Sequence, residues 1–556
     1  MNSEKHKMQT ILSQASSMNI MAEETDMSLT LETPVGKING KVVKMDGKYV
    51  GEFLGIPYSK QPIGDRRFKF LEPLDEKLDH KVSPFLAHRK GNSAVQLQQG
   101  KFWDTKMPVG EDCIYLNIYT PLGSEPENFQ KLSESKLPVL FHIHGGGFKI
   151  GSGSEPMYDL SFFAVRHDIV CVNINYRLDM LGFLSYPGVI EDNLGLKDQQ
   201  VALKWTHENI SAFGGDQDRV TIYGCSAVQS SVRDEMMSWT KPRMVRILGG
   251  ASVHYHTLSP ESSKYFARAF ASSGTVNRLW SRFYRNDHYK KTLKALKMLG
   301  GPKNPTAEQV RDFFINLSVD KIKERQIQAK DFITQTKVDQ SVSFIPVDEF
   351  EEEKLPSKSR MAQKPLLLGV ASDEGTMFSD MIFPRKDITK PTWCRQIFSE
   401  FFGEKVFYQP LRELLDEISS IPNLPVFVYL FDYKCPTRHK DLFPEAEVPM
   451  HFGSFHSLDI PFLFNLAEKK SYLMDPCESD KRVNETCTTM LASFVKSDDL
   501  SQFPLVRYET TKKTVNKITA DGLTPVGSDC LLPKRKALAF KTITASAMLL
   551  MAPNKY

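Results

Sequence analysis

The feature that most constrains the fold of this chain is a short apolar run that ends abruptly in small residues. Val220-Thr221-Ile222-Tyr223 is β-branched and aromatic, which predicts a strand. Gly224-Cys225-Ser226 follows at once and begins a G-x-S-x-G pattern, in which a strand turns sharply into a helix. Small neighbours allow so tight a turn, and the serine is held at a strained φ and ψ. The pattern predicts a serine hydroxyl that projects above the end of a central strand.

This pattern is interrupted after Ala227. The second glycine belongs at the position of Val228, and the missing pair occurs later as Gly249-Gly250. Without residues 228–248 the sequence would read Gly-Cys-Ser-Ala-Gly-Gly-Ala-Ser-Val. Two origins stay open for these residues: translated intron sequence, or a genuine insert that disables the site. In either case Val228 puts a branched side chain where the backbone must approach closely.

A second stretch of small residues follows another apolar strand. Residues 138–143 are predicted as a strand that runs into His144 and three glycines, residues 145–147. Only glycine lets several backbone N–H groups converge on one point without a Cβ in the way. A flexible loop could have the same composition, but the strand before it and Phe148 after it favour a fixed loop that presents N–H donors.

The order of predicted elements indicates the fold class. A strand, the glycine loop, an apolar strand at residues 169–177, a helix at 192–210 and the strand before Ser226 follow one another. A near-continuous apolar run such as 169–177 is typical of a central parallel strand. Strands that alternate with helices predict an α/β fold with a large, mostly parallel twisted sheet flanked by helices.

Together these motifs resemble the type-B carboxylesterase and cholinesterase-like family of α/β-hydrolases, in which Gly-Glu-Ser-Ala-Gly-Gly is usual around the serine. Residues 53–68 and the Glu-Asp-Cys-Ile-Tyr-Leu-Asn run at 111–117 also resemble signatures of that family. The resemblance implies an α/β-hydrolase fold and a serine carboxylic-ester hydrolase that acts through an acyl-enzyme on small-molecule esters. It implies no metal and no organic cofactor.

The same resemblance assigns the nucleophile and the oxyanion hole. Ser226 matches the family's nucleophile. The backbone N–H groups of Gly146, Gly147 and Ala227 match the donors that hold the oxyanion.

The acid and the base of the implied triad follow later in the chain. Glu374 lies in a stretch similar to the family's D/N-E-G-x-x-F motif, and we expect Asp373 to be its exposed neighbour. Without that context, two solvated carboxylates on a loop would be the default interpretation. His456 matches the histidine of G-x-x-H-x-x-E/D, whereas the competing His451 precedes the glycine and lies outside the motif. The order serine, glutamate, histidine is the order of α/β-hydrolases.

A second class of function stays open. If residues 228–248 are translated, the helix behind the nucleophile loses its first turns, so we expect the 556-residue chain to be a poor esterase or an inactive one. Some relatives keep the fold without catalysis and serve in cell adhesion. The alternative to an esterase is therefore a catalytically impaired pseudoenzyme or a binding protein.

Composition excludes several other classes. The chain has 556 residues, 41% of them hydrophobic and 25% charged, which is ordinary for a globular protein with a large core. A net charge of +4 without a basic stripe argues against nucleic acid as a partner. We expect no membrane span, because no run of about 18 apolar residues occurs. The eight cysteines show no CxxC spacing, which makes a zinc site improbable.

We expect a disordered leader at residues 1–30 and one domain at 31–556 with an atypical insert at 228–248. The stretch from Val515 to the end matches nothing in the family and is expected to be solvated. Near residues 405–408 the chain looks shorter than its relatives, as if a helical segment were missing. The oligomeric state stays unknown.

The cysteines bear on the cellular location. In secreted relatives the cysteine matched by Cys113 forms a disulfide with an upstream cysteine, and here Ala94 stands at that upstream position. No signal peptide is recognisable in the leader. Both features predict a reducing compartment, and so a cytoplasmic location.

Overall fold

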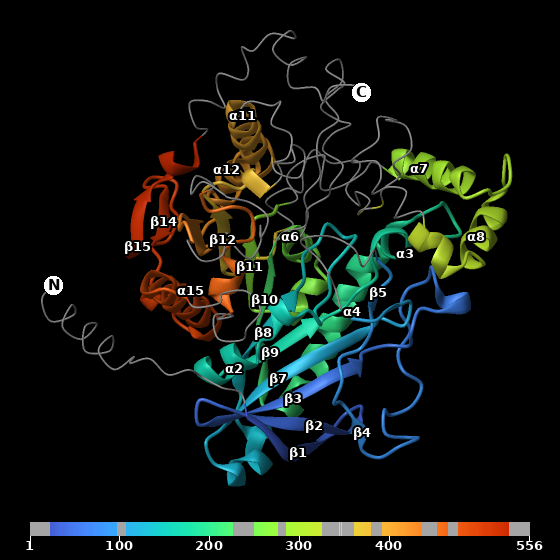
Figure 1. Cartoon of the computed structure of the whole chain (residues 1–556), viewed down its shortest axis with the longest axis horizontal. Helices are drawn as coiled ribbons and strands as arrows, with labels where there is room; N and C mark the ends of the chain where they lie inside the picture. The colour runs from blue at the N-terminus through green and yellow to red at the C-terminus, as the bar shows by residue number, and fades with distance from the viewer. Residues whose placement is uncertain are drawn as a thin grey trace, which may run out of the picture.

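A large twisted sheet runs through the molecule, with helices on both of its faces (Figure 1). The computed structural model describes residues 23–96, 107–225, 250–275, 285–324, 344, 346, 361–377, 379, 392–435, 453–464 and 476–532. Within these residues thirteen strands form the sheet, in the order β1-β2-β3-β7-β9-β8-β10-β11-β12-β13-β14-β15, with β4 beside β2, while β5 and β6 form a separate pair. The strands are β1 (Glu23–Thr33), β2 (Gly36–Met45), β3 (Lys48–Pro57), β4 (Phe85–Leu86), β5 (Ser93–Ala94), β6 (Val109–Gly110), β7 (Tyr115–Gly123), β8 (Leu137–Ile143), β9 (Val170–Ile174), β10 (Gly215–Cys225), β11 (Arg268–Ser272), β12 (Leu366–Ala371), β13 (Val426–Phe431), β14 (Thr514–Thr519) and β15 (Gly522–Gly527).

The middle of the sheet, from β9 to β14, is parallel, and both of its ends are antiparallel. Strands that are buried on both faces need apolar side chains on both, which explains the near-continuous apolar runs of the sequence. In β10, Val220 and Ile222 pack into the core on one face, and Tyr223 and Cys225 into the core on the other. This alternation follows from the two-residue period of a strand.

Helices cover the two faces. Helices α4 and α6 contribute to the core on one face, and α2 and α15 to the core on the other. The α-helices are α2 (Ser161–His167), α3 (Asp179–Phe183), α4 (Leu194–Asn209), α6 (Gly250–Leu258), α7 (Arg285–Met298), α8 (Ala307–Ile315), α11 (Thr392–Gly403), α12 (Gln409–Ile418), α14 (Ile460–Leu463) and α15 (Glu478–Lys496). The other helical turns are the 3₁₀ helices η1 (Gly64–Arg66), η2 (Pro126–Glu134), η3 (Pro156–Tyr158), η4 (Ile210–Phe213), η5 (Ser262–Tyr265), η8 (Leu500–Gln502) and η9 (Ser528–Leu531) and the π-helix η6 (Glu404–Tyr408).

The chain changes direction in the sheet at β8. From β8 it passes through α2 to β9 on one side, and then through α3 and α4 to β10 on the other side of β8. In open α/β sheets, ligands bind outside the carboxyl ends of the strands at such a switch point. The fold therefore predicts a ligand site at the loops after β8 and β10.

The structure confirms the strands predicted before the glycine loop, at 169–177 and before Ser226, but it corrects the predicted boundary of the leader. Order does not begin at Leu31, because β1 already pairs with β2 from Glu23. Met27 and Leu29 pack against the core from this strand. The period-2 alternation of β1 was hidden among polar residues. Residues 1–22 and the insert at 228–248 lie outside the described residues.

The expected solvated tail is also wrong in part. β14 and β15 form an antiparallel hairpin that extends the sheet beyond β13. Val515 and Ile518 are fully buried, and the buried Asn516 side chain donates to the carbonyl oxygens of Val428 (3.0 Å) and Val506 (2.9 Å). A buried amide that spans two chain segments is invisible to a sequence pattern, because its partners are distant in the chain.

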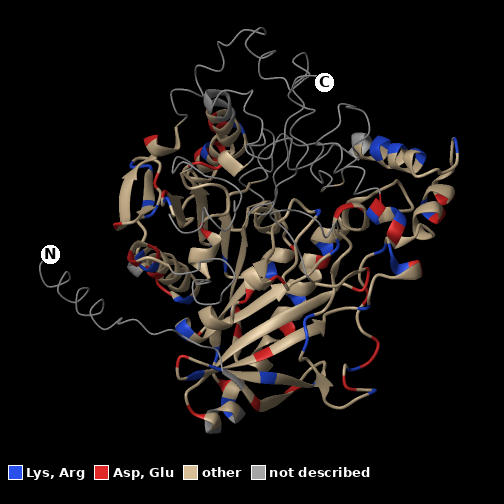
Figure 2. Cartoon of the chain, viewed as in Figure 1, with Lys and Arg blue, Asp and Glu red and all other residues tan. Residues whose placement is uncertain are grey.

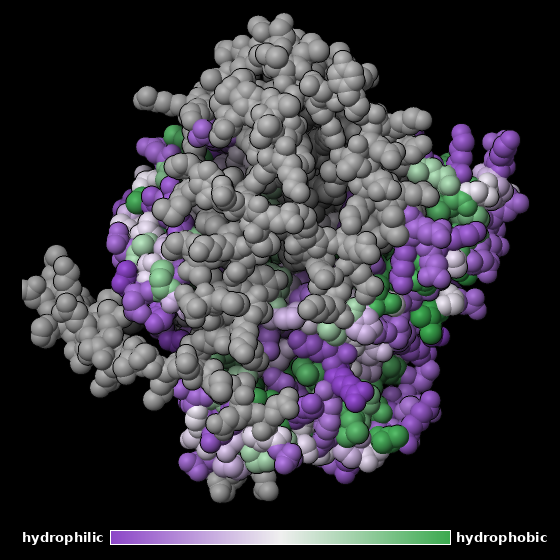
Figure 3. Space-filling view, in the orientation of Figure 1, coloured by the Kyte–Doolittle hydropathy of each residue, from purple (hydrophilic) through white to green (hydrophobic). Residues whose placement is uncertain are grey.

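Charged side chains lie mostly on the helices and loops around the sheet (Figure 2). On the face that Figure 3 shows, the coloured surface is mainly hydrophilic, with smaller apolar areas between the polar ones. Among the described helices, none combines the length and the apolar character that crossing a bilayer requires.

Candidate active site

Three predicted site segments leave the sheet at one edge. β8, β10 and β12 belong to the same parallel block, so their carboxyl ends point the same way. The glycine loop follows β8, the acid loop follows β12, and β10 ends at Cys225, immediately before Ser226. Ser226 and Ala227 themselves lie outside the described residues, so their roles stay predictions.

The predicted acid and base meet. The imidazole Nδ1 of His456 lies 2.5 Å from Oε2 of Glu374, although the two residues come from loops far apart in the chain. Both are buried, with 0% of Glu374 and 1% of His456 exposed. The other carboxylate oxygen, Oε1, accepts hydrogen bonds from the Ser273 hydroxyl (2.6 Å) and the Ala371 N–H (2.7 Å). Hydrogen bonds of this kind stabilise a buried carboxylate and fix its orientation.

Asp373 has a different position from the one expected. It is half-buried rather than exposed, and it joins the acid loop to the histidine loop. Its N–H donates to the carbonyl of Ser454 (2.9 Å), and its Oδ2 accepts from the Ser454 N–H (3.2 Å). A Cβ on Gly453, which has φ +62°, would lie 1.8 Å from that Oδ2. Asp373 therefore holds the backbone of the histidine loop at Ser454; His451 lies outside the described residues.

The glycine loop has a backbone conformation that favours glycine. Gly146 has φ +116° and Gly147 has φ +71°, in the region that favours glycine. A Cβ on Gly146 would lie 2.1 Å from the carbonyl oxygen of Ile150. Among the described residues, neither of the two glycine N–H groups donates to a backbone acceptor. The loop thus presents two N–H groups beside the end of β10.

Buried side chains hold this loop in place. The His144 ring stacks on Tyr176, with centroids 4.5 Å apart, and the Tyr176 hydroxyl donates to the His144 carbonyl (3.0 Å). Burial lowers the pKa of His144 to about 4, so its imidazole is neutral at pH 7. At the far end of the loop, the Gln96 amide makes two hydrogen bonds to the backbone of Gly151. These contacts hold both ends of the glycine loop against neighbouring segments.

Sequence reasoning missed a polar cluster beneath the site. The carboxylate of Asp459, which is 2% exposed, accepts at Oδ2 from the hydroxyls of Ser272 (2.8 Å) and Tyr429 (2.6 Å). Burial raises the pKa of Asp459 above its usual value. Cys225 packs nearby, with Sγ 3.8 Å from the Ser457 hydroxyl. The signal was present in the sequence, since Asp459 is the acidic residue three positions after the histidine in its motif.

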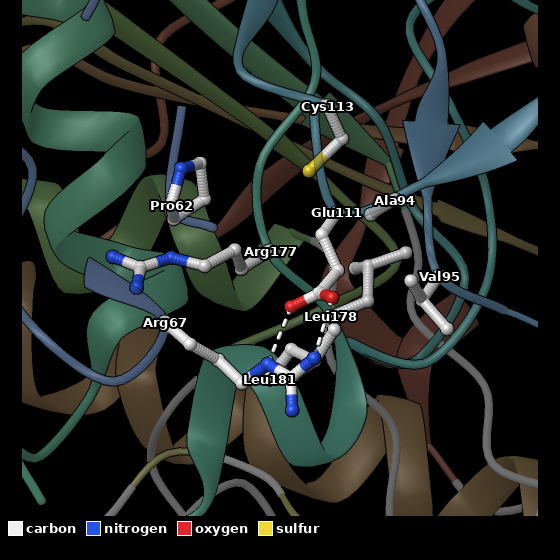
Figure 4. Close-up of a pocket in the computed structure, with 9 residues that line it drawn as sticks. All are labelled: Pro62, Arg67, Ala94, Val95, Glu111, Cys113, Arg177, Leu178 and Leu181. Atoms are coloured by element: carbon white, nitrogen blue, oxygen red, sulfur yellow. Dashed lines mark hydrogen bonds and ion pairs between the residues drawn. The ribbon is translucent and has the colours of Figure 1, made fainter. Parts of the chain in front are cut away.

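A small pocket lies beyond the carboxyl end of β9, where Arg177, Leu178 and Leu181 line it (Figure 4). Ala94 and Cys113 both line it, and Cys113 is a free thiol whose pKa is raised well above the usual value by burial. Arg67 and Glu111 form an ion pair there, with Nε and Oε1 2.5 Å apart. Arg67 also donates to the carbonyl oxygens at the end of α8, at residues 314, 315 and 317. The pocket is filled by a structural ion pair, so we assign it no catalytic role.

Among the described residues, no group of three or more His, Cys, Asp or Glu side chains is arranged to hold a metal ion. The described part of the site combines a buried carboxylate–imidazole pair with the backbone N–H groups of the glycine loop.

Known proteins share this sequence and fold. The model of the "Carboxylesterase family" matches residues 27–395 and 389–526. The cholinesterase of Mus musculus is 30% identical over 498 residues, which are 80% of this chain and 74% of that protein. The para-nitrobenzyl esterase of Bacillus subtilis (strain 168) is 27% identical over 495 residues, 83% of this chain and 89% of that protein. A solved thermophilic PNB esterase matches with a TM-score of 0.67 and 24% identity over 91% of this chain and 100% of its own. These matches confirm the resemblance and the predicted α/β-hydrolase fold.

Proposed function

The chain belongs to the carboxylesterase family, whose members are serine hydrolases, and we propose that it hydrolyses small-molecule carboxylic esters through a triad of Ser226, His456 and Glu374. The observation that carries the proposal is the buried contact between Glu374 and His456 at the edge where β10 ends. A buried carboxylate that orients an imidazole beside a serine is the arrangement that activates the serine hydroxyl.

The proton transfers follow from which imidazole nitrogen is engaged. Nδ1 of His456 is bonded to Glu374, so Nε2 takes the proton of Ser226 as the hydroxyl attacks the ester carbonyl. The carboxylate stabilises the imidazolium that forms. The same Nε2 then gives its proton to the leaving alcohol, and an acyl-enzyme remains. Water repeats the sequence: Nε2 accepts a proton from water as the water oxygen attacks the acyl carbon, and the acyl–oxygen bond to Ser226 then breaks. Nε2 returns the proton to the Ser226 oxygen, and the acid leaves.

The developing oxyanion needs donors that are already in place. In this proposal the N–H groups of Gly146 and Gly147, joined by that of Ala227, supply them. One such donor is worth about 2.7–4 kcal/mol of transition-state stabilisation. The positive φ of Gly146 and the anchors of the loop support this role, because a preorganised donor costs no reorganisation during the reaction.

The interruption after Ala227 decides which form of the chain is active. α6 begins at Gly250 and contributes to the core that lies on β10. A Cβ on Gly250 would lie 2.6 Å from the carbonyl oxygen of Ser272, so a glycine is needed at this close approach. Joined directly to Ala227, Gly249-Gly250 would complete the elbow in register. We therefore assign activity to the chain without residues 228–248 and impaired activity to the 556-residue chain.

The test compares both chains. Each is expressed and assayed with p-nitrophenyl acetate, together with Ser226→Ala in the shorter chain. We expect turnover in the shorter chain, much lower turnover in the full chain, and none above background for Ser226→Ala. Equal turnover of the two chains would remove the idea that residues 228–248 impair the site. A folded but inactive shorter chain would favour the pseudoenzyme instead.

We also propose a cytoplasmic location. Support comes from the free Cys113 thiol and from Ala94 in the place of the disulfide partner of secreted relatives. Cell fractionation with an antibody to the native chain tests it, and recovery from the culture medium would contradict it.

A further inference from the structure

The helix nearest the acid–base pair contains a wide turn. α11, the π-helix η6 and α12 form one continuous helical run, which includes residues 405–408, near which the chain looks shorter than its relatives. The N–H of Gln409 donates to the carbonyl of Glu404, five residues back, which defines a π-turn. Pro410 supplies the cause. It has no N–H for the carbonyl of Val406, and a proline ring clashes with the carbonyl four residues before it.

The wide turn buries more side chains than an ordinary helical turn would. Four of its five residues are buried: Glu404, Val406, Phe407 and Tyr408, so that only Lys405 is partly exposed. An amphipathic α-helix buries residues three or four apart, not three in succession. A wider turn reduces the angle between neighbouring side chains, so Phe407 and Tyr408 can both face the protein interior.

These two neighbours contact the two halves of the pair. The Phe407 ring lies on the imidazole of His456, with centroids 4.8 Å apart and planes at 41°. The Tyr408 hydroxyl donates to the carbonyl of Ala371 (2.7 Å), and the N–H of Ala371 donates to Glu374. One turn of helix therefore touches the base directly and the acid through the end of β12.

The turn is fixed on both sides. A Cβ on Gly375 would lie 1.9 Å from the carbonyl oxygen of Ser399 in α11, so the acid loop and the helix pack backbone to backbone. On its other side, Glu404 pairs with Arg412, with Oε1 and Nη2 2.5 Å apart. Arg412 also donates to the carbonyl of Leu531 at the end of η9. Because the helix packs this closely against the acid loop, a shift of the helix would move the loop with it.

We propose that the π-turn Glu404–Tyr408 is a positioning element for the acid–base pair. Phe407 sets the tilt of the His456 ring and shields its bond to Glu374 from water, and Tyr408 sets the end of the strand that presents Glu374. The inference rests on the proposed function, because it gives the turn the task of holding that pair. A core phenylalanine that only fills space would have the same burial, so the test must measure the hydrogen bond between His456 and Glu374 itself.

The test uses the proton that His456 and Glu374 share. An imidazole N–H bonded to a carboxylate and shielded from water gives a far-downfield proton NMR resonance, which can be measured in the 556-residue chain whether or not Ser226 is reactive. We expect this resonance in the unaltered chain and its loss in His456→Gln, which assigns it. In Phe407→Ala it should broaden or vanish through exchange with water, and in Tyr408→Phe it should shift. Leu415→Ala, at a fully buried position of α12, is the control and should retain it.

Kinetics of the chain without residues 228–248 give the second readout. Phe407→Ala and Tyr408→Phe should lower kcat about 10- to 100-fold with KM nearly unchanged, because displacement of a reacting group slows chemistry without weakening binding. Leu415→Ala should leave kcat close to the unaltered value. An unchanged resonance in Phe407→Ala, or its absence from the unaltered chain, would overturn the inference. Activity that survives Ser226→Ala would instead refute the proposed function, and the NMR result would still stand.

Discussion

At Glu374, contacts from three parts of the chain converge on one buried carboxylate. The imidazole of His456 contacts Oε2, while a hydroxyl and a backbone N–H bond Oε1. Both carboxylate oxygens therefore have hydrogen-bond partners, and the His456 ring has one favoured orientation. The carboxylate of Asp373, its immediate neighbour, accepts from the Ser372 hydroxyl and the Ser454 N–H. Adjacent carboxylates in one motif thus have separate tasks, which the motif alone could not show.

Glu374→Gln should retain the shape of the site but remove the charge that stabilises the imidazolium. In the chain without residues 228–248 we expect kcat to fall about 10⁴-fold, because the amide favours the wrong imidazole tautomer. Asp373→Asn is the control and should change kcat far less. Steady-state rates with p-nitrophenyl acetate measure both, and equal losses would contradict the assignment of Glu374 as the acid.

Gly146→Ala tests the oxyanion loop. The added Cβ would lie 2.1 Å from the Ile150 carbonyl oxygen at a φ of +116°, so the loop must shift and its N–H donors with it. We expect a loss of about 10²- to 10³-fold in kcat, the loss of one oxyanion donor. Gly188→Ala is a matched control, because Gly188 also has a positive φ (+72°) but no atom within 4 Å of its Cβ position. A similar kcat in both variants would argue against a role for Gly146.

At the scale of elements, the sequence predicted what a local pattern encodes. β8 is a short apolar run that was predicted within one residue of its observed bounds, whereas β10 begins at Gly215, before the apolar run predicted at residues 220–223. β1 and β14 were missed because polar residues alternate with the apolar ones on strands near the edges of the sheet. The π-turn was missed because a proline such as Pro410 normally indicates the end of a helix. Tertiary contacts decide these elements, and a sequence window does not contain them.

Arg67 joins two elements that are distant in the chain. It pairs with Glu111 and donates to three carbonyl oxygens at the end of α8, and its own side chain is 8% exposed. Arg67→Ala leaves a mostly buried carboxylate and several carbonyls without their donor, so we expect a loss of about 3 kcal/mol in unfolding free energy. Arg311→Ala removes a partly exposed ion pair with Asp312 and should cost at most about 1 kcal/mol. Denaturant titrations compare them, and equal costs would contradict the structural role of Arg67.

At the scale of the whole molecule, the large core makes stability depend on pH. Burial lowers the pKa of His142, His254 and His256 to about 3, against 6.5 for an exposed imidazole. The unfolded chain therefore binds more protons than the folded one below pH 6.5. Stability should be level above about pH 6.5 and fall as the pH drops, by up to about 1.4 kcal/mol per pH unit for each histidine.

His256→Gln isolates one of these contributions. His256 lies between the Ser262 hydroxyl (2.9 Å) and the Gln199 amide oxygen (3.0 Å), and glutamine cannot titrate in its place. We expect a shallower fall in unfolding free energy between pH 6.5 and pH 5 than in the unaltered chain. His80→Gln, at an exposed position, should leave that slope close to the unaltered one. Equal slopes in all three proteins would contradict the buried, neutral state of His256.

The family and the enzyme class were predictable from the sequence, because the glycine loop, the serine motif and the histidine motif are local patterns with a fixed order. The contact between Glu374 and His456 was predictable only through the family resemblance, because 82 positions separate the two residues and no rule of sequence spacing connects them. The cluster around Asp459 and the π-turn required coordinates. That the chain forms a single domain stays a prediction, and its predicted start at residue 31 is corrected to Glu23.

The most direct test of the central claim is the site of covalent labelling by a fluorophosphonate probe. The chain without residues 228–248 is treated with the probe, and peptide mass spectrometry locates the adduct. The account predicts one adduct on Ser226, lost in His456→Gln and absent from Ser226→Ala. An adduct on another residue, or a folded chain that reacts equally well without His456, would contradict it.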